Sequence, residues 1–144
     1  MKRYKVGYTQ GTFDMFHIGH LNLIRNAKEY CDYLMVGVNS DELVNSYKHK
    51  KPVICEDERA EIVRNLKSVD ECFITTTLDK EIVLKQHPYD VIFIGDDWKG
   101  NARWEETERA LALKGVDVVF LPHTDGISST ALTRVIKDML EDQP

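Results

Sequence analysis

Five short apolar runs, separated by stretches with helical spacing, constrain the fold of this chain more than any other feature. The clearest run, residues 33–38, is almost continuously apolar, as expected for a strand that is covered on both faces. The first run alternates apolar and polar residues over residues 4–8 and ends at a turn around Gly11. The other runs occupy residues 69–75, 91–94 and 116–121.

Helices are expected between these runs. They should begin near His20, at Asp57 or Glu58, at residue 78, at residue 104 and at Ser128 or Ser129. Strands that alternate with helices along a whole chain favour parallel pairing, with helices on both faces of the sheet. We therefore predict an α/β fold, a Rossmann-like, doubly wound parallel sheet of about five strands in a three-layer α/β/α arrangement. Residues 39–56 lack a clear period and are expected to form a mobile basic loop.

Length and composition indicate a single domain over residues 1–144, large enough to bury its own core. The formal net charge of −5 argues against a generally basic surface that would bind nucleic acid. The three cysteines lack the spacing of a metal or redox pair, so we expect reduced thiols in a cytoplasmic protein. No apolar stretch approaches the roughly 20 residues that a membrane helix needs.

Four groups of unusual residues follow predicted strands, at residues 11–20, 48–51, 95–98 and 123–130. Ligands of doubly wound sheets bind beyond the carboxyl ends of the strands, where the winding reverses. The four groups should therefore surround one crevice.

His17 and His20 stand at the start of the first helix, where unpaired backbone N–H groups and the helix dipole favour a phosphate. Gly19 leaves room for a phosphoryl group beside the backbone. Two other interpretations stay open at this point. The histidines could be one core and one surface residue, or a zinc pair, although no further zinc ligands lie at suitable spacing.

Each of the remaining residue groups, taken alone, allows more than one interpretation. Lys48, Lys50 and Lys51 suit a solvated loop, and residues 126–130 suit either a helix cap or a second phosphate site. Arg59 is a cation in a helical first turn, which opposes the helix dipole and makes a ligand role more plausible. Together they favour a polyphosphate ligand, although the chain lacks both the P-loop and the dinucleotide-binding glycine motifs.

These residues resemble the cytidylyltransferase family of the nucleotidyltransferase superfamily, most closely its bacterial glycerol-3-phosphate branch. The resemblance runs in order over nearly the full chain. It rests on Gly11-Thr12-Phe13-Asp14, His17-Ile18-Gly19-His20, Glu58-Arg59, Val69-Asp70-Glu71, Gly95-Asp96-Asp97-Trp98 and Thr124-Asp125-Gly126-Ile127-Ser128.

The resemblance implies transfer of CMP from CTP to a small phosphorylated alcohol, glycerol 3-phosphate above all, which gives CDP-glycerol and pyrophosphate with Mg²⁺ as cofactor. It implies no metal site built by protein ligands, no nucleic acid, no membrane insertion and a homodimer. It assigns catalytic contacts with the phosphates or the acceptor to His17, His20, Lys48 and Arg59. It assigns nucleotide binding to Gly11, Thr12, Phe13, Lys50, Asp97, His123, Thr124, Gly126, Ile127, Ser128, Ser129 and Thr130. A phosphate acceptor is already a nucleophilic oxyanion, so positioning and charge neutralisation suffice for catalysis.

Three departures from the family pattern keep alternatives open. His123 and Lys67 stand where the family usually has arginine, which affects charge and bidentate binding. Residues 127–130 also resemble an adenylyltransferase ending, with Thr133 at its arginine position. An adenylyltransferase that uses ATP on a phosphorylated cofactor precursor is therefore a second hypothesis, and a nucleotide-binding sensor without catalysis is a third.

Overall fold

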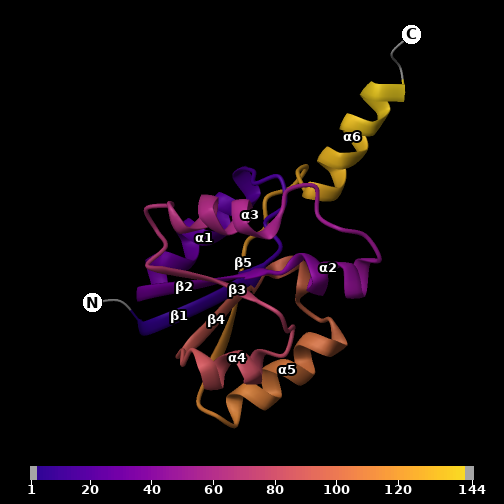
Figure 1. Cartoon of the computed structure of the whole chain (residues 1–144). Coiled ribbons are helices and arrows are strands. Elements are labelled where there is room, and N and C mark those ends of the chain that lie inside the picture. The colour runs from indigo at the N-terminus through magenta and orange to yellow at the C-terminus, as the bar shows by residue number, and fades with distance from the viewer. Residues whose placement is uncertain (1–2, 142–144) are drawn as a thin grey trace.

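Five parallel strands form one sheet in the order β3-β2-β1-β4-β5 (Figure 1). The computed structural model describes residues 3–141, so both ends of the expected 1–144 domain lie outside the described residues. The strands are β1 (Tyr4–Gly11), β2 (Cys31–Asn39), β3 (Glu71–Thr75), β4 (Val91–Gly95) and β5 (Asp117–Leu121). The chain winds outward from β1 to β3 and then returns to the other side of β1, which places the reversal between β1 and β4. The predicted parallel α/β architecture is confirmed.

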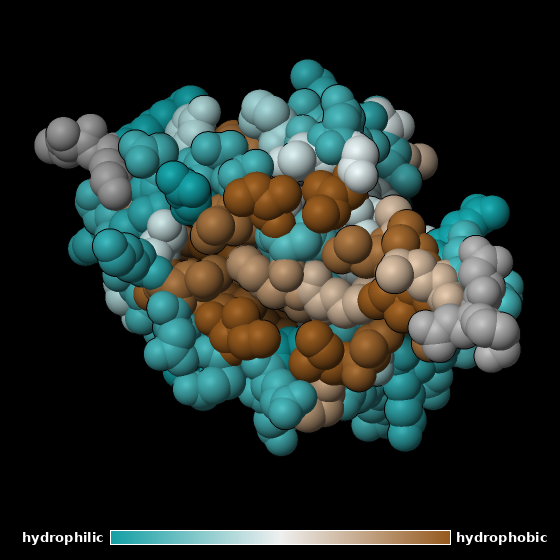
Figure 2. Space-filling view, turned by 90° about the horizontal axis from the view of Figure 1, so that it is seen from above, coloured by the Kyte–Doolittle hydropathy of each residue, from teal (hydrophilic) through white to brown (hydrophobic). Residues whose placement is uncertain are grey.

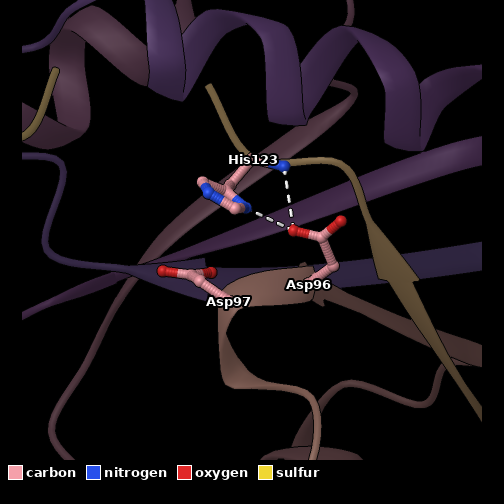
Figure 3. A group of neighbouring side chains, drawn as sticks. All are labelled: Asp96, Asp97 and His123. Atoms are coloured by element: carbon pink, nitrogen blue, oxygen red, sulfur yellow. Dashed lines mark hydrogen bonds and ion pairs between the residues drawn. The ribbon is translucent and has the colours of Figure 1, made fainter. Parts of the chain in front are cut away.

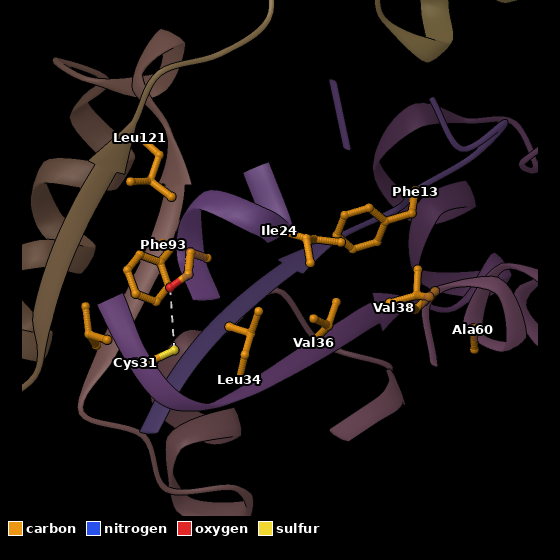
Figure 4. Close-up of a cluster of buried hydrophobic side chains, with 12 residues drawn as sticks. Phe13, Ile24, Cys31, Leu34, Val36, Val38, Ala60, Phe93 and Leu121 are labelled. Atoms are coloured by element: carbon orange, nitrogen blue, oxygen red, sulfur yellow. Dashed lines mark hydrogen bonds between the residues drawn. The ribbon is translucent and has the colours of Figure 1, made fainter. Parts of the chain in front are cut away.

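Helices cover both faces of the sheet (Figure 1). Helices α1 (Ile18–Tyr30) and α3 (Glu56–Arg64) pack on one face, and α4 (Lys80–Gln86) and α5 (Ala102–Ala112) on the other. The first face holds the larger apolar cluster, which includes Ile24 of α1, Val36 of β2 and Ala60 of α3 (Figure 4). Residues 34–39 of β2 are all buried, as its continuous apolar run predicted.

One helix differs from the sequence prediction. Residues expected as a loop contain α2 (Asp41–Lys48), which has Ser40 as its N-cap, with its side chain accepting a hydrogen bond from Leu43 N. Only Val44 of α2 is buried, so the sequence of this helix shows almost no apolar period. Its N-cap, Ser40, is the feature of the sequence that could have predicted it. Residues 96–98 form a 3₁₀ turn, η1 (Asp96–Trp98), directly after β4.

The final helix, α6 (Ser129–Glu141), projects away from the sheet and its covering helices (Figure 1). None of its residues is buried. Hydrophobic surface forms a broad band across the face seen in Figure 2. Among the described residues, no helix is both long and apolar enough to cross a membrane.

The second apolar cluster depends on the absence of a side chain at Gly37. The ring of Tyr8 is fully buried there and stacks between Phe73 and Tyr89, with ring centroids 5.8 Å and 5.0 Å away. A Cβ at position 37 would lie 2.2 Å from the Tyr8 hydroxyl oxygen. The neighbouring rings leave the tyrosine little room to move.

We expect Gly37→Ala to lower the free energy of unfolding by about 1 to 3 kcal/mol, the usual range for overpacking a core. Urea denaturation measures this loss. In a Tyr8→Phe background the clashing oxygen is absent, so the same substitution should cost clearly less. Equal losses in both backgrounds would contradict the proposed clash.

Candidate active site

A cavity of about 680 Å³ opens at the carboxyl ends of the strands, beside the reversal of the winding. Its walls come from segments far apart in the sequence, as the four residue groups predicted. Two predicted site residues, Arg59 and Gly126, do not line it. The predicted residues that line it are Gly11, Thr12, Phe13, His17, His20, Lys48, Lys50, Asp97, His123, Thr124, Ile127, Ser128, Ser129 and Thr130.

The turn between β1 and α1 is held in an uncommon backbone conformation. Phe13 and Met15 have positive φ angles of 55° and 47°, which are unfavourable for side chains of this size. Asp14 lies between them, and its carboxylate accepts hydrogen bonds from Val53 N at 2.8 Å and Ile54 N at 2.9 Å. The turn that carries the histidines is thereby attached to the segment that follows the lysines.

His17 and His20 form a reciprocal cap at the start of α1. His17 Nδ1 accepts a hydrogen bond from Gly19 N at 3.0 Å, and His20 Nδ1 accepts one from His17 N at 3.2 Å. The two rings stack with centroids 3.8 Å apart. Because each Nδ1 accepts, a neutral ring carries its proton on Nε2. His17 Nε2 is buried and has no hydrogen-bond partner in the described chain, so it is a donor without an acceptor in a wall of the cavity.

Burial keeps both imidazoles neutral. It lowers the pKa of His17, and it lowers the pKa of His20 to about 4, assisted by His17 and opposed by the Asp14 carboxylate. At neutral pH the pair therefore offers N–H donors rather than two positive charges. These donors suit a phosphate whose negative charge increases during reaction.

The depressed pKa of His20 makes stability fall in acid. The unfolded chain binds a proton at this histidine near pH 6.5, whereas the folded chain does so only near pH 4. The free energy of unfolding should therefore decrease by up to about 3 kcal/mol as the pH falls through this window. His20→Gln preserves the cap, since glutamine suits this helix position, and removes the titrating ring. Urea denaturation at pH 7.5 and pH 5 should show a smaller loss for the variant, while the other four histidines are common to both proteins.

Arg59 does not line the cavity, although the family resemblance assigns it a contact with the phosphates or the acceptor. Its side chain is fully buried and donates to the backbone oxygens of Thr12 at 2.7 Å, Asn39 at 2.8 Å and Ile54 at 2.8 Å. It also forms an ion pair with Asp41 at 2.6 Å. Arg59 occupies the first turn of α3, where the helix dipole disfavours a cation. Its structural role explains this position, because the buried guanidinium connects four segments behind the cavity.

We expect Arg59→Lys to destabilise the fold by about 2 to 4 kcal/mol, because lysine leaves buried acceptors unpaired. Arg64→Lys, an exposed change in the same helix, is the matched control and should alter stability by less than about 0.5 kcal/mol. Thermal and urea denaturation measure both. A variant that keeps wild-type stability but loses nucleotide affinity would instead restore Arg59 as a direct phosphate contact.

At the mouth of the cavity, His123 pairs with Asp96 (Figure 3) and also with the carboxylate of Asp125. Its Nδ1 contacts Asp96, which raises the pKa of His123 and lowers that of Asp96, and its Nε2 lies 2.8 Å from Asp125. The protonated form of His123 is therefore favoured, which supplies the positive charge that the family usually has from arginine at this position. Both ring nitrogens of His123 already have partners, however. Asp96, Asp97 and His123 could together approach a metal ion. However, Mg²⁺ prefers oxygen ligands, and His123 offers nitrogen.

The cavity residues that were missed from the sequence include Lys80, Arg103 and Trp104. Lys80 Nζ donates to Leu78 O at 2.8 Å and lies 5.6 Å from the centroid of the Trp104 ring. Burial and the nearby Arg103 lower the pKa of Lys80 to about 8, against the opposing effect of Asp79. Lys80 is the first residue of α4, where a cation opposes the helix dipole, and that signal could have identified it.

The profile of the cytidylyltransferase-like family matches residues 8–135, most of the chain and nearly all of the sheet and cavity. The chain belongs to the cytidylyltransferase-like family. This confirms the resemblance inferred from the motifs, and it makes the protein a nucleotidyltransferase. The glycerol-3-phosphate cytidylyltransferase of Bacillus spizizenii is 37% identical, over 91% of this chain and 94% of its own length.

Other similar proteins are named for different activities. The FAD synthase of Korarchaeum cryptofilum is 39% identical over 88% of each chain. Among solved structures, a lipopolysaccharide core biosynthesis protein from Thermoplasma volcanium has a TM-score of 0.74 at 25% identity, covering 85% of this chain and 99% of its own. Pantothenate synthetase from Thermus thermophilus, with a TM-score of 0.65 at 18% identity over 92% of this chain and 62% of its own, supports the fold alone.

Proposed function

We propose that the protein transfers CMP from CTP to a small phosphorylated alcohol, glycerol 3-phosphate in the first instance. The observation that carries this proposal is the stacked pair of neutral histidines, with His17 Nε2 unpartnered, in the wall of a cavity edged by cationic side chains. The glycerol-3-phosphate cytidylyltransferases among the relatives support the choice of substrates.

In the proposed reaction, a phosphate oxygen of the acceptor attacks the α-phosphorus of CTP. A new P–O bond forms, the bond between the α-phosphorus and the bridging oxygen to the β-phosphorus breaks, and pyrophosphate leaves with the electron pair. No proton must be removed from the acceptor oxyanion. The Nε2–H groups of His17 and His20 stabilise charge at the reacting phosphate.

The triphosphate is assigned to the side of the cavity that carries Lys48 and Lys50 and to the start of α6 at residues 128–130. Of the carboxylates that line the cavity, Asp14 is already occupied by backbone N–H groups, which leaves Asp97. This donor set suits Mg²⁺ that arrives with the nucleotide and takes most of its ligands from phosphates and water. Bound in this way, Mg²⁺ would neutralise charge on the triphosphate.

The acceptor phosphate is assigned to Lys80 and Arg103, beside Trp104. Neither cation forms an ion pair with a carboxylate in residues 3–141. Lys80 is partly buried, whereas Arg103 is exposed. A partly buried cation such as Lys80 is unfavourable without an anionic partner, and a bound phosphate would supply one. The indole ring beside Lys80 would cover the carbon chain of the alcohol.

A second candidate is adenylyl transfer from ATP to a phosphorylated cofactor precursor. The FAD synthases among the relatives favour it, at 33–39% identity for those from Thermococcus onnurineus and Korarchaeum cryptofilum. The same cavity and histidine pair would serve either nucleotide. A sensor that binds nucleotide without turnover is the third candidate, and the altered family positions His123 and Lys67 motivate it.

Pyrophosphate release from a matrix of four nucleoside triphosphates and several phosphorylated acceptors distinguishes these candidates. We expect turnover with CTP and glycerol 3-phosphate. Turnover only with ATP and a flavin or similar phosphate would establish the second candidate. Nucleotide binding in calorimetry without pyrophosphate release from any combination would establish the sensor.

We expect Lys80→Met to raise the KM of the acceptor by about tenfold or more, since a charged hydrogen bond is worth about 1.5 to 3 kcal/mol. The KM of CTP should change little. Lys85→Met, an exposed change near the end of the same helix, is the control and should leave both constants unchanged. A Lys80 variant in which only the KM of CTP rises would assign this end of the cavity to the nucleotide instead.

A further inference from the structure

Four neutral polar side chains line the cavity and have no part in the reaction proposed above. They are Gln10, Thr12, Asn39 and Tyr47, from the end of β1, the turn after it, the end of β2 and helix α2. The phosphates of both substrates are assigned to the cations and the helix start of the same cavity. These four side chains are therefore free to contact a part of the substrates that carries no charge.

Buried hydrogen bonds fix the orientation of the two amides. Gln10 Oε1 accepts from the hydroxyl of the buried Tyr8, which leaves Gln10 Nε2 as the donor. Gln10 Nε2 donates to Asn39 Oδ1 at 2.9 Å and to Thr77 O at 3.0 Å. Asn39 is only 4% exposed, and its backbone oxygen accepts from Arg59. Because Oδ1 is occupied by Gln10, the Asn39 amide presents Nδ2 to its other neighbours.

The hydroxyls of Thr12 and Tyr47 form a pair in which one proton has no acceptor. Their oxygens lie 3.2 Å apart, and Asn39 Nδ2 donates to each of them at 3.4 Å. Only one of the two hydroxyl protons can lie between the oxygens, and the other has no acceptor within residues 3–141. Tyr47 is 38% exposed and Thr12 is less exposed, so the tyrosine proton is the one that a ligand can reach.

We propose that the Tyr47 hydroxyl binds a free hydroxyl group of the acceptor and thereby selects phosphorylated alcohols that carry further hydroxyls. A phosphate oxygen only accepts hydrogen bonds and binds more strongly to a cation. An alcohol hydroxyl both donates and accepts, as the tyrosine hydroxyl does. The inference rests on the proposed function, and it names the residue that distinguishes one acceptor from another.

Hydrogen bonds connect this hydroxyl pair to the part of the cavity assigned to the acceptor phosphate. Asn39 leads to Gln10, and Gln10 bonds to the backbone oxygen of residue 77. The next residue, Leu78, accepts through its backbone oxygen from Lys80 Nζ at 2.8 Å. Residues 123–130, which the family resemblance assigns to the nucleotide, instead follow β5 at one edge of the sheet. A hydroxyl of the alcohol is therefore the neutral group that best suits Tyr47.

Two acceptors that differ only in their hydroxyl groups, glycerol 3-phosphate and propyl phosphate, test this contact. With CTP, we expect wild-type kcat/KM to be about tenfold higher for glycerol 3-phosphate, because a site that bonds to a hydroxyl rejects the analogue without it. Tyr47→Phe keeps the ring and removes the hydroxyl. It should lower kcat/KM for glycerol 3-phosphate about three- to tenfold, as expected for one neutral hydrogen bond, and leave propyl phosphate within about twofold.

Tyr33→Phe is the matched control. Tyr33 is also 38% exposed, but its hydroxyl donates to Glu71 and the residue does not line the cavity. This variant should turn over both acceptors as the wild type does. Equal losses for the two acceptors in Tyr47→Phe would overturn the inference, because they would assign the hydroxyl to the structure of the site alone. A change confined to the KM of CTP would also overturn it and would place Tyr47 beside the nucleotide.

Titration calorimetry separates the inference from the proposed reaction, since binding of the two acceptors requires no turnover. Tighter binding of glycerol 3-phosphate than of propyl phosphate, lost in Tyr47→Phe and kept in Tyr33→Phe, would support the contact even if no pyrophosphate were released. Turnover of glycerol 3-phosphate with a preference that Tyr47→Phe leaves unchanged would uphold the reaction and refute the contact.

Discussion

The buried guanidinium of Arg59 is the interaction on which the cavity depends. It bonds to the turn after β1, the end of β2, the start of α2 and the segment before α3. A charge that is removed from water must be surrounded by acceptors, so these four segments can occupy only one arrangement around it. That arrangement places the lysines at the end of α2 beside the histidines at the start of α1, although neither group contacts Arg59 itself.

Most carboxylates close to the cavity, with the exception of Asp97, are committed to internal bonds, which reconciles an acidic protein with anionic substrates. Asp14 accepts two backbone N–H groups, Asp41 pairs with Arg59, and Asp96 pairs with His123. By contrast, Lys48, Lys50 and Lys80 form no ion pairs within residues 3–141. The net charge of −5 therefore does not describe the local potential, which these uncompensated cations dominate.

The fold was readable from the sequence wherever burial is periodic. The apolar run of β2 and the position of the two histidines at the start of α1 were correctly predicted, because each is encoded by neighbouring residues. Helix α2 was missed because only Val44 of it is buried. The buried surroundings of Arg59 could not be predicted, since its partners are mostly backbone oxygens that no residue type reveals. Lys80 was missed because its neighbours Arg103 and Trp104 are distant in sequence.

The position of α6 connects the chemistry of the cavity to the surface of the molecule. Its first turn lines the cavity and forms a hydrogen bond to the turn that carries the histidines. Its apolar face is not covered by the rest of the described chain. Helix formation is cooperative along the chain, so an anion bound at the start of α6 would stabilise the whole helix and not its first turn alone.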